Sequence, residues 1–306
     1  MEENTHSSGE MCPEDSNVPG VAQEVCLQKQ NMGSSDSETQ NGLLEEEDMH
    51  GRYSRMTRYL LLMSLEECTS YSRLPFFHEL EDIEFYGISA VTNYIRLCLF
   101  REEFSKILEK RNEKNTYCEV KHVEFLLSRC VLLCPLPTYP RFVLVVAFLI
   151  NVIILDVDNI ECFRITYLAE YCLNVLYGRM FSKIFRSRED YQCLKNFCHR
   201  FYRQLELCST MSELRKTPVF VTWRKLIQGC IEDSDGFFPF KQSEINLYFK
   251  AVRERNCMEC EPEMARTLES TYFSGPEFRK MQSLCQICGA QCHNYLTYVS
   301  SFISKN

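Results

Sequence analysis

The stretch FVLVVAFLINVIIL, from Phe142 to Leu155, decides the fold, and Asn151 is its only polar residue. It is too short to span a bilayer, which takes roughly 20 apolar residues, and it is bounded by Arg141 and Asp156. Its β-branched residues favour a strand, but buried strands usually run only about 4–8 residues. Because Pro140 is tolerated in a first helical turn, the stretch predicts a buried central helix surrounded by amphipathic helices.

Helical periodicity continues on both sides of this stretch. Apolar residues recur three and four positions apart, the spacing of an amphipathic helix, over 56–63, 85–99, 120–133, 160–185 and 194–205. Pro135–Pro140 predicts an extended turn, since a residue that precedes proline is pushed out of the α region. The sequence therefore predicts an all-α, multi-helix globular domain around a buried central helix at about 142–155.

The acidic charge is concentrated at the N-terminus. Residues 1–50 carry twelve acidic residues and one lysine, a net charge of −11, so the −8 of the whole chain leaves +3 for residues 51–306. This segment has no aromatic residue, and such a polar composition buries too little apolar surface to fold. We predict a disordered acidic tail over 1–50, a helical core domain over 51–240 and a C-terminal helical region over 241–306.

The use of cysteine indicates the compartment. The chain has 18 cysteines in 306 residues, a share of about 6%, below the roughly 8–10% of a short secreted disulfide scaffold. Several of them, such as Cys98, Cys130 and Cys172, stand singly in apolar segments. The N-terminus also lacks the basic flank and apolar core of a secretory signal. We therefore expect a reducing compartment, the cytoplasm or the nucleus, and not secretion.

The sequence contains no motif of a known catalytic mechanism. The patterns GxxxxGK[ST], GxGxxG, HExxH and GxSxG do not occur. His78 and His122 are each flanked by charged residues, which predicts solvated positions. Asp156 and Asp158 follow the apolar stretch and are expected at a solvated helix exit. We predict that the chain is not an enzyme.

One constellation near the C-terminus has the spacing of a metal site. Two Cys-x2-Cys hooks supply the four thiolates of a tetrahedral structural zinc site. The hook cysteines are Cys257, Cys260, Cys285 and Cys288, with Cys292 and His293 as alternates. Gly289 directly after the second hook suits a tight knuckle around a metal. The hooks predict a zinc ion that supports the C-terminal region.

The alternative for these cysteines is a set of buried thiols. Composition alone produces roughly one Cys-x2-Cys pair in such a chain, and the twenty-four residues between the hooks exceed the roughly 15–20 of a zinc ribbon. Cys285, Cys288 and Cys292 also share a helical stripe with Tyr295 and Val299, as small apolar core residues would. Both interpretations stay open.

A second candidate site is a basic, aromatic face over 177–203. Four phenylalanines alternate there with seven basic residues: Arg179, Lys183, Arg186, Arg188, Lys195, Arg200 and Arg203. Basic and aromatic side chains together can bind phosphates and stack on bases. The alternative is an ordinary amphipathic segment whose aromatic residues face the core and whose basic residues face solvent.

These observations favour an intracellular helical interaction or regulatory protein, adaptor-like, with a protein partner and without membrane insertion. A buried central helix ringed by amphipathic ones resembles the architecture of cyclin-like helical domains, a resemblance that does not by itself establish a function. The alternative is a nucleic-acid-binding protein that uses the basic face 177–203 together with a C-terminal structural zinc site.

Overall fold

The computed structural model describes residues 42–67, 83–111, 118–160, 162–208, 210–233, 237–256, 288 and 292–300. No strand occurs among these residues, which confirms the all-α prediction. The helices are α2 (Gly42–Met63), α3 (Ile83–Tyr94), α4 (Arg101–Glu109), α6 (Glu119–Leu133), α7 (Tyr139–Ile160), α8 (Arg164–Arg179), α9 (Arg188–Leu207), α10 (Met211–Leu214), α11 (Pro218–Glu232), α12 (Gln242–Asn256) and α14 (Cys292–Ser300). Two 3₁₀ turns, η1 (Ser64–Glu67) and η4 (Phe181–Lys183), and one π-helical turn, η3 (Ile95–Leu99), join some of them.

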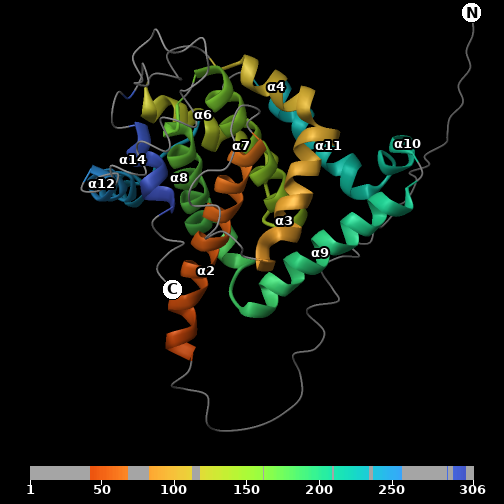
Figure 1. The fold of residues 1–306 in the computed structure, drawn as a ribbon, viewed down its shortest axis with the longest axis horizontal. Coiled ribbons are helices and arrows are strands. Elements are labelled where there is room, and N and C mark those ends of the chain that lie inside the picture. Colours follow the sequence, from red (N-terminus) through yellow and green to blue (C-terminus); the bar gives the residue numbers. More distant parts are fainter. Residues whose placement is uncertain are drawn as a thin grey trace, which may run out of the picture. The chain divides into compact units, whose positions relative to one another are not determined.

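The predicted central helix is α7, and it is buried on every side. Its residues from Phe142 to Ile153 have less than a tenth of their surface exposed. It packs against α2, α3, α4, α6, α8, α9 and α11, and Figure 1 shows α6 and α8 on one side of it and α3 on the other. By length and composition alone Tyr139–Asp158 would also be able to cross a membrane, but most of this window is buried inside the fold. The apolar stretch is therefore the core around which the other helices assemble.

Local capping residues mark the starts of two helices. Ser187 and Asp190 form a capping box at the start of α9, in which the Asp190 N–H donates to Ser187 Oγ and the Ser187 N–H donates to Asp190 Oδ2. At the start of α11, Thr217 Oγ1 accepts from the Phe220 N–H, and Pro218 occupies the first helical position. Such caps satisfy backbone donors that have no partner within the helix.

The two ends of the chain are described only in part. Helix α2 begins at Gly42, inside the range 1–50 that the sequence assigns to the acidic tail, and residues 1–41 lie outside the described residues. Tyr53 anchors α2, since its hydroxyl donates to the Leu173 carbonyl of α8 at 3.0 Å.

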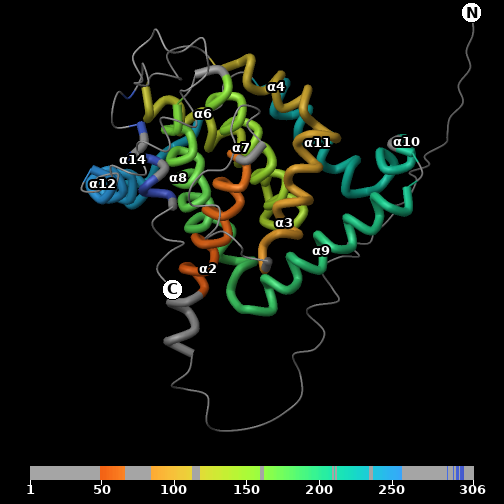
Figure 2. The backbone as a smooth tube through the Cα atoms, in the orientation of Figure 1, coloured from red at the N-terminus to blue at the C-terminus, as the bar shows by residue number. Residues whose placement is uncertain are grey.

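The predicted C-terminal region begins just before α12. Helix α14 packs against α8, α12 and α2, and Figure 2 shows α12 and α14 side by side next to α8. This packing brings residues near the end of the chain to the N-terminal half of α8.

Candidate metal centre

Three cysteines from distant parts of the chain meet where α8 begins. Cys162 precedes α8, Cys292 is the first residue of α14, and Cys288 lies one turn before it in sequence. Their sulfur atoms all lie within 4.8 Å of one another, and Cys162 Sγ and Cys288 Sγ are 3.4 Å apart. This separation is well beyond the roughly 2.05 Å of a disulfide bond.

The spacing of the three sulfur atoms fits a metal ion. Zn–S bonds of about 2.3 Å in a tetrahedral site place the sulfur atoms about 3.8 Å apart. The separation of Cys162 Sγ and Cys288 Sγ, 3.4 Å, is close to this value, and no pair of the three sulfur atoms is more than 4.8 Å apart. Cys162 and Cys292 are buried, with 3% and 2% of their surface exposed, while Cys288 is half-buried. The group therefore lies within metal-binding distance and has one side open to solvent.

The start of α8 provides an electrostatic environment that suits thiolates. The Phe163 N–H donates a hydrogen bond to Cys292 Sγ at 3.3 Å, and Phe163 is the N-cap of α8. Unpaired N–H groups and the helix dipole together favour negative charge at a helix N-terminus. The side chain of Cys292 therefore lies at the end of α8 where a negatively charged sulfur is stabilised.

A tyrosine and carboxylate network holds α14 in place beside the cysteines. Tyr295 of α14 donates from its hydroxyl to Glu119 Oε1 of α6 at 2.8 Å, and Tyr248 of α12 donates to Glu119 Oε2. The guanidinium of Arg255 lies 4.4 Å from the ring centre of Tyr295 and 4.9 Å from that of Tyr167. Burial raises the pKa of the Tyr295 hydroxyl, so this group stays a hydrogen-bond donor.

A second contact fixes the other end of α14. Arg58 of α2 donates to Glu170 Oε1 of α8 through Nε at 3.1 Å and through a terminal nitrogen at 2.9 Å. The same guanidinium lies 5.4 Å from the ring centre of Tyr298. A cation over an aromatic face is attractive, and more so when it is desolvated. Because Arg58 and Glu170 are both buried, α14 closes over an internal ion pair.

The structure brings together only part of the ligand set that the sequence predicts. Cys288 and the alternate Cys292 belong to the group. Cys257, Cys260 and Cys285 lie outside the described residues, and the side chain of His293 is also outside them. Cys162 is a member that the spacing of the hooks does not reveal, because it is more than a hundred residues away in sequence. The sequence also places Cys162 within the predicted helical segment 160–185, where it resembles a small core residue, whereas α8 begins only at Arg164.

Other cysteines of the described core have a different character. Cys130, Cys172 and Cys198 are buried in the apolar interior, and burial raises the pKa of each thiol, that of Cys198 to about 12. They behave as small apolar residues that stay protonated. The interpretation as buried thiols therefore fits these scattered cysteines.

The predicted basic face is divided by the fold. Arg179 donates to both carboxylate oxygens of Glu244, at 2.5 and 2.7 Å, and lies over the ring of Phe238 at 4.0 Å. Lys195 donates to Glu84 Oε1 at 3.0 Å. These two residues join elements within the protein. The exposed members of the set are Lys183, Arg186, Arg188, Arg200 and Arg203.

The aromatic members of that face are also placed inward. Phe181, Phe185 and Phe201 are buried, and Phe197 is half-buried against the core. None of these four rings is exposed for stacking on a base. Tyr202, between the two exposed arginines of the second half of α9, keeps 48% of its surface exposed.

Two residues that the sequence predicts to be solvated are buried instead. His122 and Asp156 have 1% and 3% of their surface exposed. Arg111 explains the difference, since it donates to both oxygens of Asp156, at 3.0 and 2.6 Å, and its NH1 lies 3.2 Å from His122 Nε2. Burial, with Arg111 and Arg164 nearby, lowers the pKa of His122 to about 3. This imidazole is neutral at physiological pH and inaccessible, which suits a structural role.

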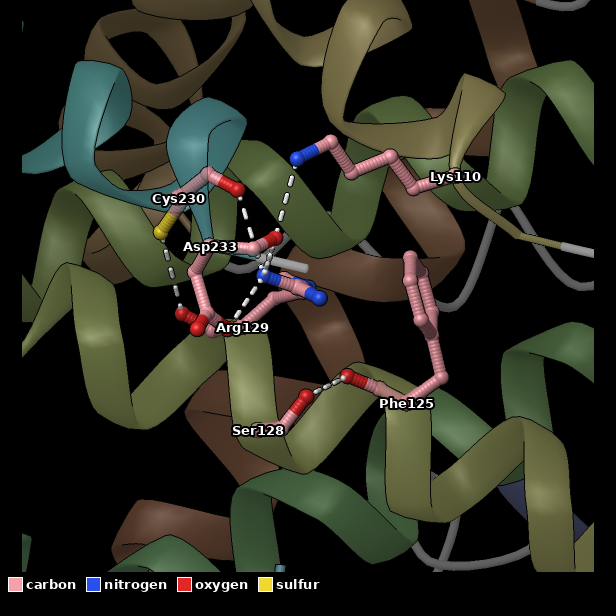
Figure 3. Close-up of polar contacts among 6 residues, drawn as sticks. All are labelled: Lys110, Phe125, Ser128, Arg129, Cys230 and Asp233. Carbon is pink, nitrogen blue, oxygen red and sulfur yellow. Dashed lines mark hydrogen bonds and ion pairs between the residues drawn. The ribbon is translucent and has the colours of Figure 1, made fainter. Parts of the chain in front are cut away.

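Arg129 forms a further buried polar cluster, which closes the end of α11 (Figure 3). Its NH1 donates to the carbonyl oxygens of Cys230 and Asp233, both at 3.1 Å, and to Asp233 Oδ2 at 2.9 Å. Lys110 also donates to the Asp233 carbonyl, at 3.0 Å. The last carbonyls of a helix have no partner within it, so Arg129 of α6 acts as a cap for a helix a hundred residues away.

No protein family, no curated protein and no solved structure matches this chain.

Proposed function

We propose that this chain is a helical interaction or regulatory protein without catalytic activity, and that it binds a partner protein through the exposed face of α3 and η3. One observation carries the proposal. The seventeen residues from Ile83 to Leu99 include only two charged ones, Glu84 and Arg96. Glu84 is ion-paired with Arg52 and Lys195, and Arg96 is buried. The solvent-facing side of these two elements therefore carries no exposed charge.

The residues on this face are uncharged, and most of them are apolar or small. Tyr86 and Leu97 keep 64% and 43% of their surface exposed, Gly87 and Cys98 are exposed, and Ala90 is half-buried. A side chain built at Gly87 would meet nothing within 4 Å. Exposed apolar patches on a folded protein mark interaction sites, and small residues let a second helix approach closely. The occupant that fits is the apolar face of an amphipathic helix of a partner protein.

The buried polar groups support a role without chemistry. His122, Asp156, Glu170 and Arg129 are all buried in ion pairs or helix caps. None of them faces solvent, where a substrate would reach it. We propose a reducing compartment for this protein, because the buried thiols of its core stay reduced there, and we propose that α7 serves as a core helix.

Gly87→Glu tests the docking face, with Gly178→Glu as its matched control. Both glycines are exposed in helices, and a side chain at either would meet nothing within 4 Å. The full-length protein and both variants are used to capture crosslinked partners from cells that express the chain. We expect Gly87→Glu to lose the partners that the wild type and Gly178→Glu retain. Equal recovery with Gly87→Glu would refute binding at this face.

A zinc ion that supports the C-terminal region is part of the same proposal. Three cysteine sulfurs within 4.8 Å of one another are soft ligands, which select zinc among the common divalent metals of proteins. We propose that the metal acts structurally, since it joins cysteines from two distant parts of the chain, and zinc sites built from cysteine ligands commonly stabilise folds. Elemental analysis of protein purified without chelator tests it, and we expect about one zinc per chain.

Nucleic-acid binding is the second candidate, and Tyr202 is the observation that favours it. Its ring is exposed between Arg200 and Arg203, the arrangement in which a base stacks while phosphates are neutralised. Binding of a single-stranded oligonucleotide should then weaken with salt and with Arg200→Glu/Arg203→Glu. Lys183→Glu, at an exposed basic residue outside α9, is the control.

A further inference from the structure

We infer that the zinc ion is held by Cys162, Cys288 and Cys292, so that the metal clasps α14 to the N-terminus of α8. This inference rests on the zinc proposed above and changes what the metal does. Ligands drawn only from 257–288 would fold the C-terminal segment upon itself. Ligands that include Cys162 join that segment to the core of the protein.

The burial of the cysteines defines what the metal ion must supply. Cys162 and Cys292 are almost fully buried, and a buried negative charge is costly unless a cation compensates it. A zinc ion between the three sulfurs supplies that charge and replaces three sulfur–proton bonds by three zinc–sulfur bonds. The three protons pass to water, so that binding releases acid and weakens as the pH falls.

The start of α8 prepares two of the ligands. Cys162 is fixed next to the N-cap Phe163, and the Phe163 N–H donates to Cys292 Sγ. Backbone N–H groups that bind a ligating sulfur orient it and stabilise its charge, as second-shell groups do in metal sites. The core cysteine Cys172, farther along the same helix, has no such donor among the described contacts, and burial raises the pKa of its thiol.

The open side of the site lies at Cys288. This residue is half-buried, which gives the ion an entry path and leaves a fourth position accessible. Among the described residues no fourth His, Cys, Asp or Glu joins the group. Structural zinc is almost always held by four protein ligands, so the fourth ligand is a side chain outside the described ones, and Cys285 and His293 are the sequence candidates.

The proposed zinc site lies beside the polar contacts of α14. Tyr295 reaches Glu119 of α6 one turn after Cys292, and Tyr298 covers Arg58 one turn later. Zinc at the first residue of α14 thus anchors the helix that carries both contacts. Removal of the metal should loosen α14 while leaving α7 and its surroundings folded.

Metal content of full-length variants tests the ligand set. Cys162→Ser and Cys292→Ser should each lose most of the zinc that the wild type holds. Cys172→Ser is the matched control, because it removes a buried thiol from α8 outside the cluster. Cys257→Ser/Cys260→Ser tests the first hook. The chain substituted with Co²⁺ should show sulfur-to-cobalt charge-transfer bands that weaken in Cys162→Ser and persist in Cys172→Ser.

The outcomes separate this inference from the proposed zinc itself. Wild-type protein without zinc would refute both. Zinc retained by Cys162→Ser and lost from Cys257→Ser/Cys260→Ser would support the proposed zinc ion but refute its ligation by Cys162. Should Cys162→Ser fail to fold, the wild type decides alone: zinc should slow alkylation of Cys162, Cys288 and Cys292 relative to chelated protein. Equal alkylation of Cys162 with and without zinc would refute Cys162 as a zinc ligand.

Discussion

Helices α7 and α14 both pack against α8, but they are held there by different means. Helix α7 contacts its neighbours through aliphatic and aromatic side chains, with Phe148 against Phe104 as an example. Helix α14 also buries Val299, and it adds polar contacts through Cys292, two tyrosines and their distant partners. The difference indicates that apolar packing defines the position of α7, whereas α14 combines apolar packing with specific polar contacts.

The largest expected effect is in the core. Phe148→Ala should lower the free energy of unfolding by about 3–5 kcal/mol, because it removes a fully buried ring and leaves a cavity. Chemical denaturation measures this loss, which should be the same with and without a chelator. Tyr86→Ala, at an exposed ring, should change stability by about 0.5 kcal/mol or less. If the loss of unfolding free energy grows when the metal is removed, the core around α7 and helix α14 unfold as one cooperative unit.

The next effect concerns the polar end of α7. The pKa of His122 is about 3 in the fold and 6.5 in the unfolded chain, so below pH 6.5 the unfolded state binds a proton that the folded state does not. Stability from His122 is therefore complete above pH 6.5 and falls as the pH drops towards 3. At about 1.4 kcal/mol per pH unit, this amounts to about 3 kcal/mol at pH 4.5.

Denaturation of His122→Gln at a series of pH values checks this expectation. The variant should lose part of the acid sensitivity of the wild type, and His199→Gln, at an exposed position, should keep it. Asp156 works in the opposite direction, since burial raises the pKa of its carboxyl against the effect of Arg111. An unchanged slope between pH 4.5 and 6.5 in His122→Gln would contradict the role of this imidazole.

Arg129→Met should destabilise the protein by about 2 kcal/mol. The substitution keeps an unbranched apolar stem but removes the guanidinium, so the carbonyls at the end of α11 lose their donor, and unmet buried acceptors cost about 1–3 kcal/mol. Hydrogen exchange should accelerate at the end of α11 and stay unchanged in α14. Arg224→Met, at an exposed position of α11, serves as the control. Faster exchange in α14 would show that the two regions are coupled.

The smallest expected effect is at the contact between α14 and the rest of the protein. Tyr295→Phe removes the hydroxyl that donates to Glu119 and should lower the local stability of α14 by about 1 kcal/mol. Hydrogen exchange in α14 should show this loss, while global denaturation should hardly change. A shift of the global transition by the full amount would place α14 within the core unit.

The core could be predicted from the sequence because its determinants are local. The apolar stretch 142–155, the capping box at Ser187 and the Thr217–Pro218 start of α11 each depend on neighbours a few residues apart. Burial of His122 and Asp156 could not be predicted, since it depends on Arg111 from another segment. For the same reason the sequence indicated Cys288 and Cys292 but not Cys162. It also did not show that Arg179 and Lys195 form ion pairs with Glu244 and Glu84.

Burial of α7 from Phe142 to Ile153 has a consequence for the synthesis of the chain. Helices α8, α9 and α11, which cover part of α7, are translated after it. The ribosome adds about 5–20 residues per second, so the segment up to Glu232 follows Ile160 by roughly 4–14 s. During that interval the most apolar helix of the protein lacks part of its cover and is exposed to chaperones that bind hydrophobic segments. A truncated chain that ends before Arg188 would remain in this state and should aggregate.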